Sequence, residues 1–301
     1  MRGTGLSNNG GSRTLVRCCE TLRQLGHDAF FYTGKSRYSW HKADIKCVGG
    51  DVHPPCDVSI ATGFNSVDSV TRYGGRTAYF VRGFELWKAS EDDLLRSYQS
   101  IGKGVFVNGE WLASKLISMG SPAVLQYSGL DWDWFKMLSR TNRSERAGVG
   151  ALRNQRHHTK RSEDIDTLER FLGTTVWQLN RHIKGPDSIK LNKWYNNLKV
   201  WFAPTELEGL HNPPMEACMA GCALVCTDHP RSGMSDYAIH GQTALVYPAR
   251  DIKRASEYVR LLLEDENFRV RLQQNMLSLL RQKIGTREDR MKEFASRLAS
   301  L

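Results

Sequence analysis

The stretch that decides the fold reads Val200-Trp-Phe-Ala-Pro-Thr-Glu-Leu-Glu208-Gly-Leu-His-Asn-Pro-Pro-Met-Glu216-Ala-Cys-Met-Ala-Gly221-Cys-Ala-Leu-Val-Cys226. A hydrophobic run leads into a glycine-containing loop, a Pro-Pro pair favours the first turn of a helix, and Gly221 ends that helix before a second hydrophobic run. Strand, helix and strand in this order form the repeating unit of parallel sheets. The stretch therefore predicts the centre of an α/β domain.

The same alternation extends in both directions along the chain. It predicts two doubly wound, Rossmann-like α/β domains that are joined near residues 128–136 and face a cleft. We assign residues 1–130 to the first domain, on which a C-terminal helix near 286–301 is expected to pack, and residues 131–285 to the second. The expected strands are 28–33, 57–62, 77–81, 104–108 and 123–127, then 148–152, 175–179, 200–203, 223–226 and 244–246; the expected helices include 15–25, 252–263 and 268–280.

Composition is that of an ordinary globular protein of 301 residues. No run approaches the roughly 18 apolar residues of a membrane span, and the N-terminus has no apolar segment typical of a signal peptide. These features predict a cytoplasmic protein, with peripheral association at a membrane surface as a further option. The cysteines do not form the pattern of a disulfide framework, and we interpret them as reduced thiols. They are Cys18, Cys19, Cys47, Cys56, Cys218, Cys222 and Cys226.

Positive charge is concentrated in residues 136–161, which contain eight basic residues and one acidic residue, Glu145. Such a stretch attracts phosphate groups of a nucleotide, of an anionic membrane or of a nucleic acid, and charge alone does not choose among them. A solvated linker is the competing interpretation. The basic residues are Lys136, Arg140, Arg143, Arg146, Arg153, Arg156, Lys160 and Arg161.

The loop between Glu208 and the helix is suited to hold a diphosphate. Backbone N–H groups of Gly209, Leu210, His211 and Asn212, together with the helix N-terminus, offer donors to phosphate oxygens. Glu216 is positioned to accept hydrogen bonds from ribose hydroxyls. A solvated loop carboxylate at Glu208 and a carboxylate that stabilises the helix dipole at Glu216 are the alternatives without a ligand.

Two glutamates with seven residues between them, in this glycine and proline setting, resemble the E-x7-E motif of GT-B glycosyltransferases, especially the retaining family 4 enzymes. The flanking segments 191–200 and 233–251 resemble the family in the same way. The resemblance implies that Glu208 lies near the donor sugar and phosphates, that Glu216 binds the nucleotide ribose, and that the backbone of Leu210 and His211 holds the phosphates. It implies no metal and no cofactor beyond the donor substrate.

The family also places an Arg and a Lys after the first strand of the C-terminal domain, to stabilise the departing diphosphate. Here the corresponding loop follows residues 148–152, and the usual Gly-Arg-x4-Lys-Gly spacing is not reproduced. We prefer Arg156 and Lys160 as the catalytic cations, with Arg153 and Arg161 as further phosphate-binding candidates. Zinc binding by Cys218, Cys222 and Cys226 is disfavoured, because a helix-to-strand reversal separates their thiols.

At the N-terminus, Gly10 and Gly11 precede an expected helix from Thr14 and resemble the glycine-rich loop of the family. No hydrophobic first strand comes before this loop, which departs from the family pattern. Arg82, Glu85 and Trp87 follow an expected strand and are candidates to line the acceptor side.

The sequence thus predicts a glycosyltransferase that moves a sugar from a UDP-, GDP-, ADP- or TDP-sugar to a glycan, lipid-linked or small-molecule acceptor, with retention. Two alternatives remain open. One is a glycosyltransferase that modifies nucleic acid, favoured by the basic stretch. The other is a noncatalytic protein that binds nucleotides or nucleic acid.

Overall fold

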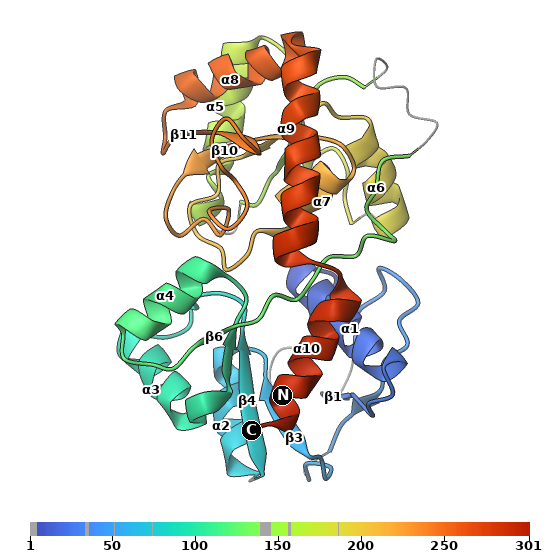
Figure 1. Ribbon diagram of the computed structural model, residues 1–301, viewed down its shortest axis with the longest axis vertical. Coiled ribbons are helices and arrows are strands. Elements are labelled where there is room, and N and C mark those ends of the chain that lie inside the picture. Colours follow the sequence, from blue (N-terminus) through green and yellow to red (C-terminus); the bar gives the residue numbers. More distant parts are fainter. Residues whose placement is uncertain are drawn as a thin grey trace. The chain divides into compact units, whose positions relative to one another are not determined.

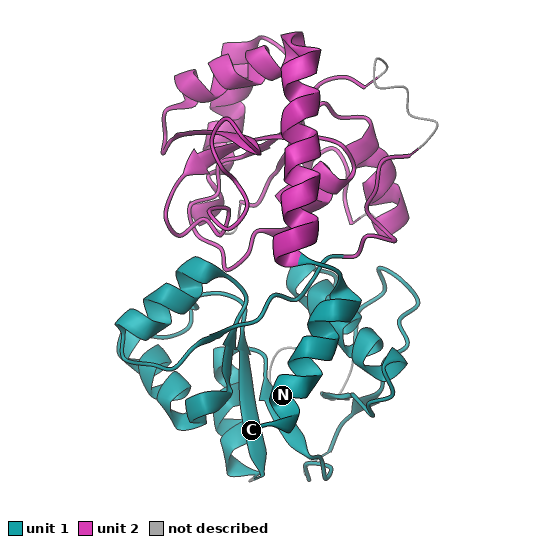
Figure 2. Ribbon diagram, in the orientation of Figure 1, with its two compact units in different colours: residues 1–130, 285–301 teal, residues 131–284 magenta. Residues whose placement is uncertain are grey.

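A computed structural model of the chain describes residues 5–33, 36–50, 52–73, 75–138, 146–155, 158–185 and 187–301. The chain divides into two compact units. Unit 1 contains residues 1–130 and 285–301, and unit 2 contains residues 131–284 (Figure 2). Each unit has its own parallel sheet, so the α/β fold with parallel sheets predicted from the sequence is confirmed.

Unit 2 contains a five-stranded parallel sheet in the order β11-β10-β9-β7-β8 (Figure 1). Its elements in chain order are β7 (Val149–Leu152), α5 (Ser162–Leu172), β8 (Val176–Leu179), α6 (Ser188–Asn196), β9 (Val200–Ala203), α7 (Asn212–Met219), β10 (Ala223–Asp228), β11 (Ala244–Pro248), α8 (Ile252–Glu264) and α9 (Glu266–Leu279). A short 3₁₀ turn, His158–Lys160, precedes α5, and a π-helical turn, Leu280–Ile284, follows α9.

Strand β9 shows why the sheet of unit 2 is buried on both faces. Val200 and Phe202 belong to a core cluster that they share with apolar residues of α5, α8 and α9. Trp201 points to the opposite face, where its ring lies 5.2 Å from that of Tyr195 on α6. Successive side chains of a strand alternate between faces, so a strand that is apolar throughout needs helices on both sides.

Unit 1 contains a four-stranded parallel sheet in the order β3-β4-β5-β6 and a separate parallel pair, β1-β2. Its elements are α1 (Gly10–Gln24), β1 (Phe31–Tyr32), β2 (Cys47–Val48), β3 (Val58–Ala61), α2 (Val67–Arg72), β4 (Arg76–Val81), α3 (Glu91–Ile101), β5 (Val105–Val107), α4 (Glu110–Ser118), β6 (Val124–Leu125) and α10 (Arg287–Ala299).

Helix α10 is the last element of the chain, yet it packs in unit 1 beside α1 (Figure 1). Phe294 is buried, and its ring centroid lies 5.3 Å from that of Phe80 on β4 and 5.1 Å from that of Phe106 on β5. Met291 and Leu298 join the same cluster. The core of unit 1 is therefore built from both ends of the chain.

The start of α1 differs from the sequence-based expectation of a helix from Thr14. The helix begins at Gly10, because the side chain of Asn9 accepts a hydrogen bond from the backbone N–H of Ser12 and caps it. Gly10 and Gly11 consequently lie in the first turn rather than in a preceding loop. No strand forms in residues 5–9, the described residues that precede this helix.

Candidate functional site

The strand order of unit 2 identifies where a ligand is expected. With its strands numbered in chain order, the sheet reads 2-1-3-4-5, so the direction of winding reverses between β7 and β9. Ligands of open α/β sheets bind beyond the carboxyl ends of the strands at such a switch point. Lys160 lies in the connection that follows β7, and Glu208 in the one that follows β9. The backbone N–H of Glu206 joins the two connections by donating to the carbonyl of Thr159 at 2.8 Å.

A third connection, the one after β10, supports the loop at Glu208. The backbone N–H of Glu208 donates to the carbonyl of Arg231 at 2.9 Å. Gly233 has φ = 70°, and a Cβ atom there would lie 2.7 Å from the carbonyl oxygen of Gly209. Only glycine combines this conformation with so close an approach. The position of the Glu208–Gly209 backbone is thus fixed by the connection after β10.

Lys160 and Glu208 meet at this point. The ammonium Nζ of Lys160 contacts the carboxylate Oε1 of Glu208. The lysine side chain is 10% exposed and that of the glutamate 32% exposed, so the pair stands at the edge of the interior. Burial lowers the pKa of Lys160 to about 7. The contact with the carboxylate acts in the opposite direction, because an adjacent negative charge favours the protonated amine.

His211 is the residue before α7, and its side chain is 2% exposed. Its backbone carbonyl accepts a hydrogen bond of 2.8 Å from the hydroxyl of Tyr237. Among the residues that the structure describes, neither ring nitrogen of His211 has a hydrogen-bond partner. Burial and the nearby positive charge of Lys160 hold the pKa of His211 well below its ordinary value, so the imidazole is neutral.

Glu216 lies on α7 and is buried, with 5% exposure. The hydroxyl of Tyr195 donates to its Oε2 at 3.5 Å. Glu208 and Glu216, chosen from their spacing, therefore lie in the loop before α7 and in the middle of α7, with Gly209, Leu210, His211 and Asn212 between them. The stretch expected to cradle phosphates leads directly into the first turn of α7.

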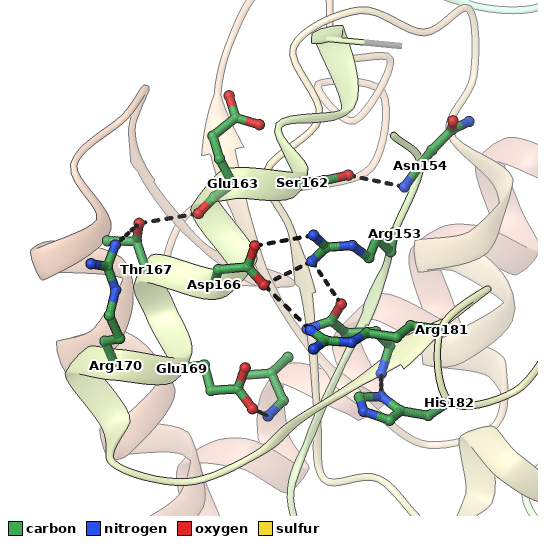
Figure 3. Close-up of polar contacts among 12 residues, drawn as sticks. Arg153, Asn154, Ser162, Glu163, Asp166, Thr167, Glu169, Arg170, Arg181 and His182 are labelled. Carbon is green, nitrogen blue, oxygen red and sulfur yellow. Dashed lines mark hydrogen bonds and ion pairs between the residues drawn. The ribbon is translucent and has the colours of Figure 1, made fainter. Parts of the chain in front are cut away.

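Arg153 and Arg161, two further cations of the β7–α5 connection, are engaged in ion pairs. Arg153 points toward α5, where its guanidinium donates to both carboxylate oxygens of Asp166 at 2.7 and 3.1 Å (Figure 3). Arg161 pairs with Asp164 at 2.9 Å and with Glu163 at 2.6 Å. These ion pairs attach the β7–α5 connection to the first turns of α5. Arg156 lies outside the described residues.

Arg146, another member of the basic stretch, is a structural residue. Its buried guanidinium donates to the carbonyls of Tyr195 and Asn196 at the end of α6, and to those of Ala220 and Gly221 after α7. Within the described part of the stretch, Arg146, Arg153, Lys160 and Arg161 thus all contact other groups of unit 2.

The residues predicted in unit 1 form a separate polar cluster. Arg82 donates to the carbonyls of Gly11 at 2.8 Å and Thr62 at 3.2 Å, which places the first turn of α1 beside the end of β4. Glu85 accepts from the backbone N–H of Phe64 at 3.3 Å. Trp87 is 57% exposed.

In the described parts of the chain, no group of three or more His, Cys, Asp or Glu side chains is placed to hold a metal ion. Cys218, Cys222 and Cys226 are buried, and burial raises the pKa of each thiol. None of the helices in the described ranges has the length and apolar character needed to cross a membrane.

The sequence-based reasoning missed three contributions to this site: the side chain of His211, the tight packing at Gly233 and the hydroxyl of Tyr237. Gly233 itself, a glycine in the connection after β10, was the available signal for the tight packing. The contacts of Tyr237 and His211 join segments 26 residues apart, and no pattern in the sequence marks them.

The chain is similar in sequence to one protein family and to one curated glycosyltransferase. Residues 178–277 match the family model described as Glycosyl transferases group 1. The capsular polysaccharide biosynthesis glycosyltransferase CapM of Staphylococcus aureus is 30% identical over 91 residues, which are 30% of this chain and 22% of that protein. The chain thus matches about a fifth of the length of this curated relative.

Three solved structures resemble the chain at low sequence identity. Anabaena HepE in complex with UDP and glucose has a TM-score of 0.80 at 11% identity, with 99% of this chain and 98% of that chain covered. Sucrose-phosphate synthase from Thermosynechococcus elongatus has a TM-score of 0.76 at 12% identity, with 97% and 93% covered. S. aureus TarM in complex with fondaparinux, alpha-GlcNAc-glycerol and UDP has a TM-score of 0.65 at 11% identity, with 80% and 55% covered.

The likeness to these structures extends over both units and shows the fold, while the family match lies in unit 2 and includes Glu208, His211 and Glu216. The resemblance drawn from the sequence is thereby confirmed at the level of the fold: the chain has the GT-B glycosyltransferase fold, and its residues 178–277 match the glycosyl transferases group 1 model.

Proposed function

We propose that the chain is a glycosyltransferase that moves a sugar from a nucleoside-diphosphate sugar to an acceptor hydroxyl, with retention of configuration. The observation that carries the proposal is the contact between Lys160 and Glu208 at the switch point of unit 2, directly before the N-terminus of α7. A buried ammonium, backbone donors and a helix N-terminus form a site for an anion of high charge.

Donor binding would exchange the partners of Lys160. The diphosphate carries more negative charge than a single carboxylate and takes over the ammonium group, which leaves Glu208 to accept hydrogen bonds from hydroxyls of the sugar. Glu216 binds the ribose hydroxyls from within α7. Arg156 is the second proposed cation, and Gly209, Leu210, His211 and Asn212 supply backbone contacts. Arg153 and Arg161 act through their ion pairs with α5, which hold the connection in place.

The bond that breaks joins the anomeric carbon of the sugar to a phosphate oxygen, and the electron pair departs with the nucleoside diphosphate. The acceptor oxygen forms the new bond on the same face of the sugar, and its proton passes to the departing phosphate. Neither glutamate needs to act as a base in this scheme. The main catalytic task of the chain is electrostatic stabilisation of the leaving group, for which Lys160 is the best-placed side chain.

The comparisons support a class of donor and a class of acceptor. HepE binds UDP and glucose, and TarM binds UDP together with fondaparinux and a GlcNAc-glycerol. CapM is named for capsular polysaccharide biosynthesis. We therefore propose a UDP-sugar as the first donor to test and a glycan or lipid-linked glycan as acceptor. The cluster of Gly10, Gly11, Arg82 and Glu85 in unit 1 is the proposed acceptor side.

The test is a panel of UDP-, GDP-, ADP- and TDP-sugars scored for binding by calorimetry and for hydrolysis. Lys160→Ala is expected to lower turnover about 100-fold, the cost of losing one preorganised donor to a developing anion. Glu216→Ala is expected to weaken binding of the nucleotide. The exposed Lys193→Ala and Glu264→Ala serve as matched controls. If no nucleotide sugar binds, or if both site variants behave like the wild type, the proposal fails.

Retention has its own test. The anomeric configuration of the glycoside formed on an acceptor is read by NMR, since the glycosidic bond prevents mutarotation. Inversion would contradict the same-face mechanism and would require a general base, which is not assigned to any residue here.

A further inference from the structure

The imidazole of His211 is a buried polar group at the start of α7 that the proposed mechanism does not use. Both of its nitrogens are inaccessible to solvent and lack a hydrogen-bond partner among the described residues. A buried donor and acceptor left without partners destabilise a folded chain. A bound ligand is one way in which such a group gains its missing partner.

The sequence of α7 shows what is missing beside this ring. A helix begins with four backbone N–H groups that have no partner inside the helix, and these form the anion-binding end. In α7 the four positions are His211, Asn212, Pro213 and Pro214. The two prolines have no N–H group, so half of the usual backbone donors are absent. The ring of His211 provides one N–H from a side chain at the same helix end.

The charges around the ring favour an anionic partner. The imidazole is neutral and has one N–H, because burial and the positive charge of Lys160 hold its pKa well below the ordinary value. The N-terminus of α7 adds the positive end of its dipole. A ligand that accepts hydrogen bonds and carries negative charge satisfies the N–H of His211, the ammonium of Lys160 and the N-terminus of α7 at once.

We propose that the side chain of His211 donates a hydrogen bond to the sugar-linked phosphate of the donor and replaces a backbone N–H that the prolines remove. This inference rests on the proposed function, since it assigns one more contact to the same donor site. The phosphate attached to the sugar is the one that distinguishes a nucleoside diphosphate from a monophosphate. His211 therefore contributes to binding of the diphosphate in particular.

The test uses the full chain and two substitutions at this position. His211→Leu keeps a side chain of similar size without either nitrogen, and His211→Gln retains an N–H donor. The exposed His27→Leu of unit 1 is the matched control. Calorimetry measures the dissociation constants of the nucleoside diphosphate and monophosphate whose base the donor panel identifies, and differential scanning calorimetry measures the melting temperature without nucleotide.

We expect His211→Leu to weaken binding of the diphosphate by about 10- to 100-fold, the range for a hydrogen bond to a charged group. Binding of the monophosphate stays unchanged, the melting temperature stays equal or rises, and His211→Gln recovers most of the lost affinity. A structural role predicts the reverse, because a ring that is bonded within the chain stabilises the fold and does not distinguish the two nucleotides.

Three results would overturn the inference: diphosphate affinity in His211→Leu equal to that of the wild type, an equal loss for both nucleotides, or a lower melting temperature without nucleotide. A wild-type chain that binds no nucleotide overturns the proposed function together with this inference. A wild-type chain that binds the diphosphate while His211→Leu binds it equally well overturns this inference alone.

Discussion

Replacing Lys160 by methionine is expected to change how the stability of unit 2 depends on pH. The ammonium of Lys160 is buried, and its pKa falls from 10.5 to about 7 in the folded chain. In the unfolded chain the same group keeps its proton up to about pH 10.5. Between these two values the unfolded state binds more protons than the folded state, so the free energy of unfolding rises with pH.

The size of the effect follows from this difference in pKa. Raising the pH from about 7 to about 9.5 should stabilise the wild type relative to Lys160→Met by about 3 kcal/mol, at 1.36 kcal/mol for each unit. The ion pair with Glu208 offsets part of the effect of burial, so the value of about 3 kcal/mol is an upper limit for the change in relative stability. Methionine has no titrating group, and its unbranched side chain can replace the buried stem of the lysine.

Urea unfolding followed by tryptophan fluorescence measures this change, with both proteins examined at both pH values. Other titrating groups are common to the two proteins and cancel in the difference between them. The exposed Lys193→Met is the control, and its difference from the wild type should not depend on pH. A difference between wild type and Lys160→Met that stays constant from about pH 7 to 9.5 would show that the ion pair outweighs burial, and would refute the reasoning.

Three further predictions concern the site and the core. The affinity for nucleotide sugars should fall as pH rises above about 7, by up to tenfold per pH unit, because Lys160 must take up a proton when the donor binds. The phosphates of nucleotide sugars do not titrate near neutrality, so calorimetry should show this trend in the wild type and not in Lys160→Met. Gly233→Ala should weaken nucleotide binding and lower the melting temperature, since its Cβ would meet the carbonyl of Gly209 at 2.7 Å; unchanged affinity would mean that the Glu208 loop adjusts freely. Phe294→Ala should destabilise unit 1 by about 3–5 kcal/mol through the cavity it leaves between Phe80 and Phe106; hydrogen exchange in peptides from β4 and β5 should rise while that in β9 stays unchanged.

The fold was largely predictable because the central strands of unit 2, such as β9, are buried on both faces. Strand β9 has the bounds 200–203 that its apolar run predicts, and β7 and β8 lie within their expected ranges. The pair β1-β2 was harder to foresee, since each strand has two residues and Cys47 is exposed. So short a pairing depends on its neighbours, and its own residues carry little signal.

The candidate site was predictable in its loop but not in its cations. The glycine and proline pattern located Glu208 and Glu216 because it reflects the backbone itself. Among the cations after β7 the pattern favoured Arg156 and Lys160, with Arg153 and Arg161 as further candidates. The structure pairs Arg153 with Asp166 on α5 and brings Lys160 to Glu208, while Arg156 lies outside the described residues. These choices depend on contacts between separate elements, and a linear pattern of charge does not contain them.

The position of α10 has a consequence for how the protein is made. On the ribosome, β4 and β5 emerge long before residues 285–301, whose Met291, Phe294 and Leu298 complete the core around them. At typical rates of translation this interval is on the order of 10 s or more. During that time nascent unit 1 leaves an apolar surface uncovered, while unit 2 receives all of its residues first. The unit that is synthesised first thus completes its core last, and a chaperone that covers its sheet would have its greatest effect in that interval.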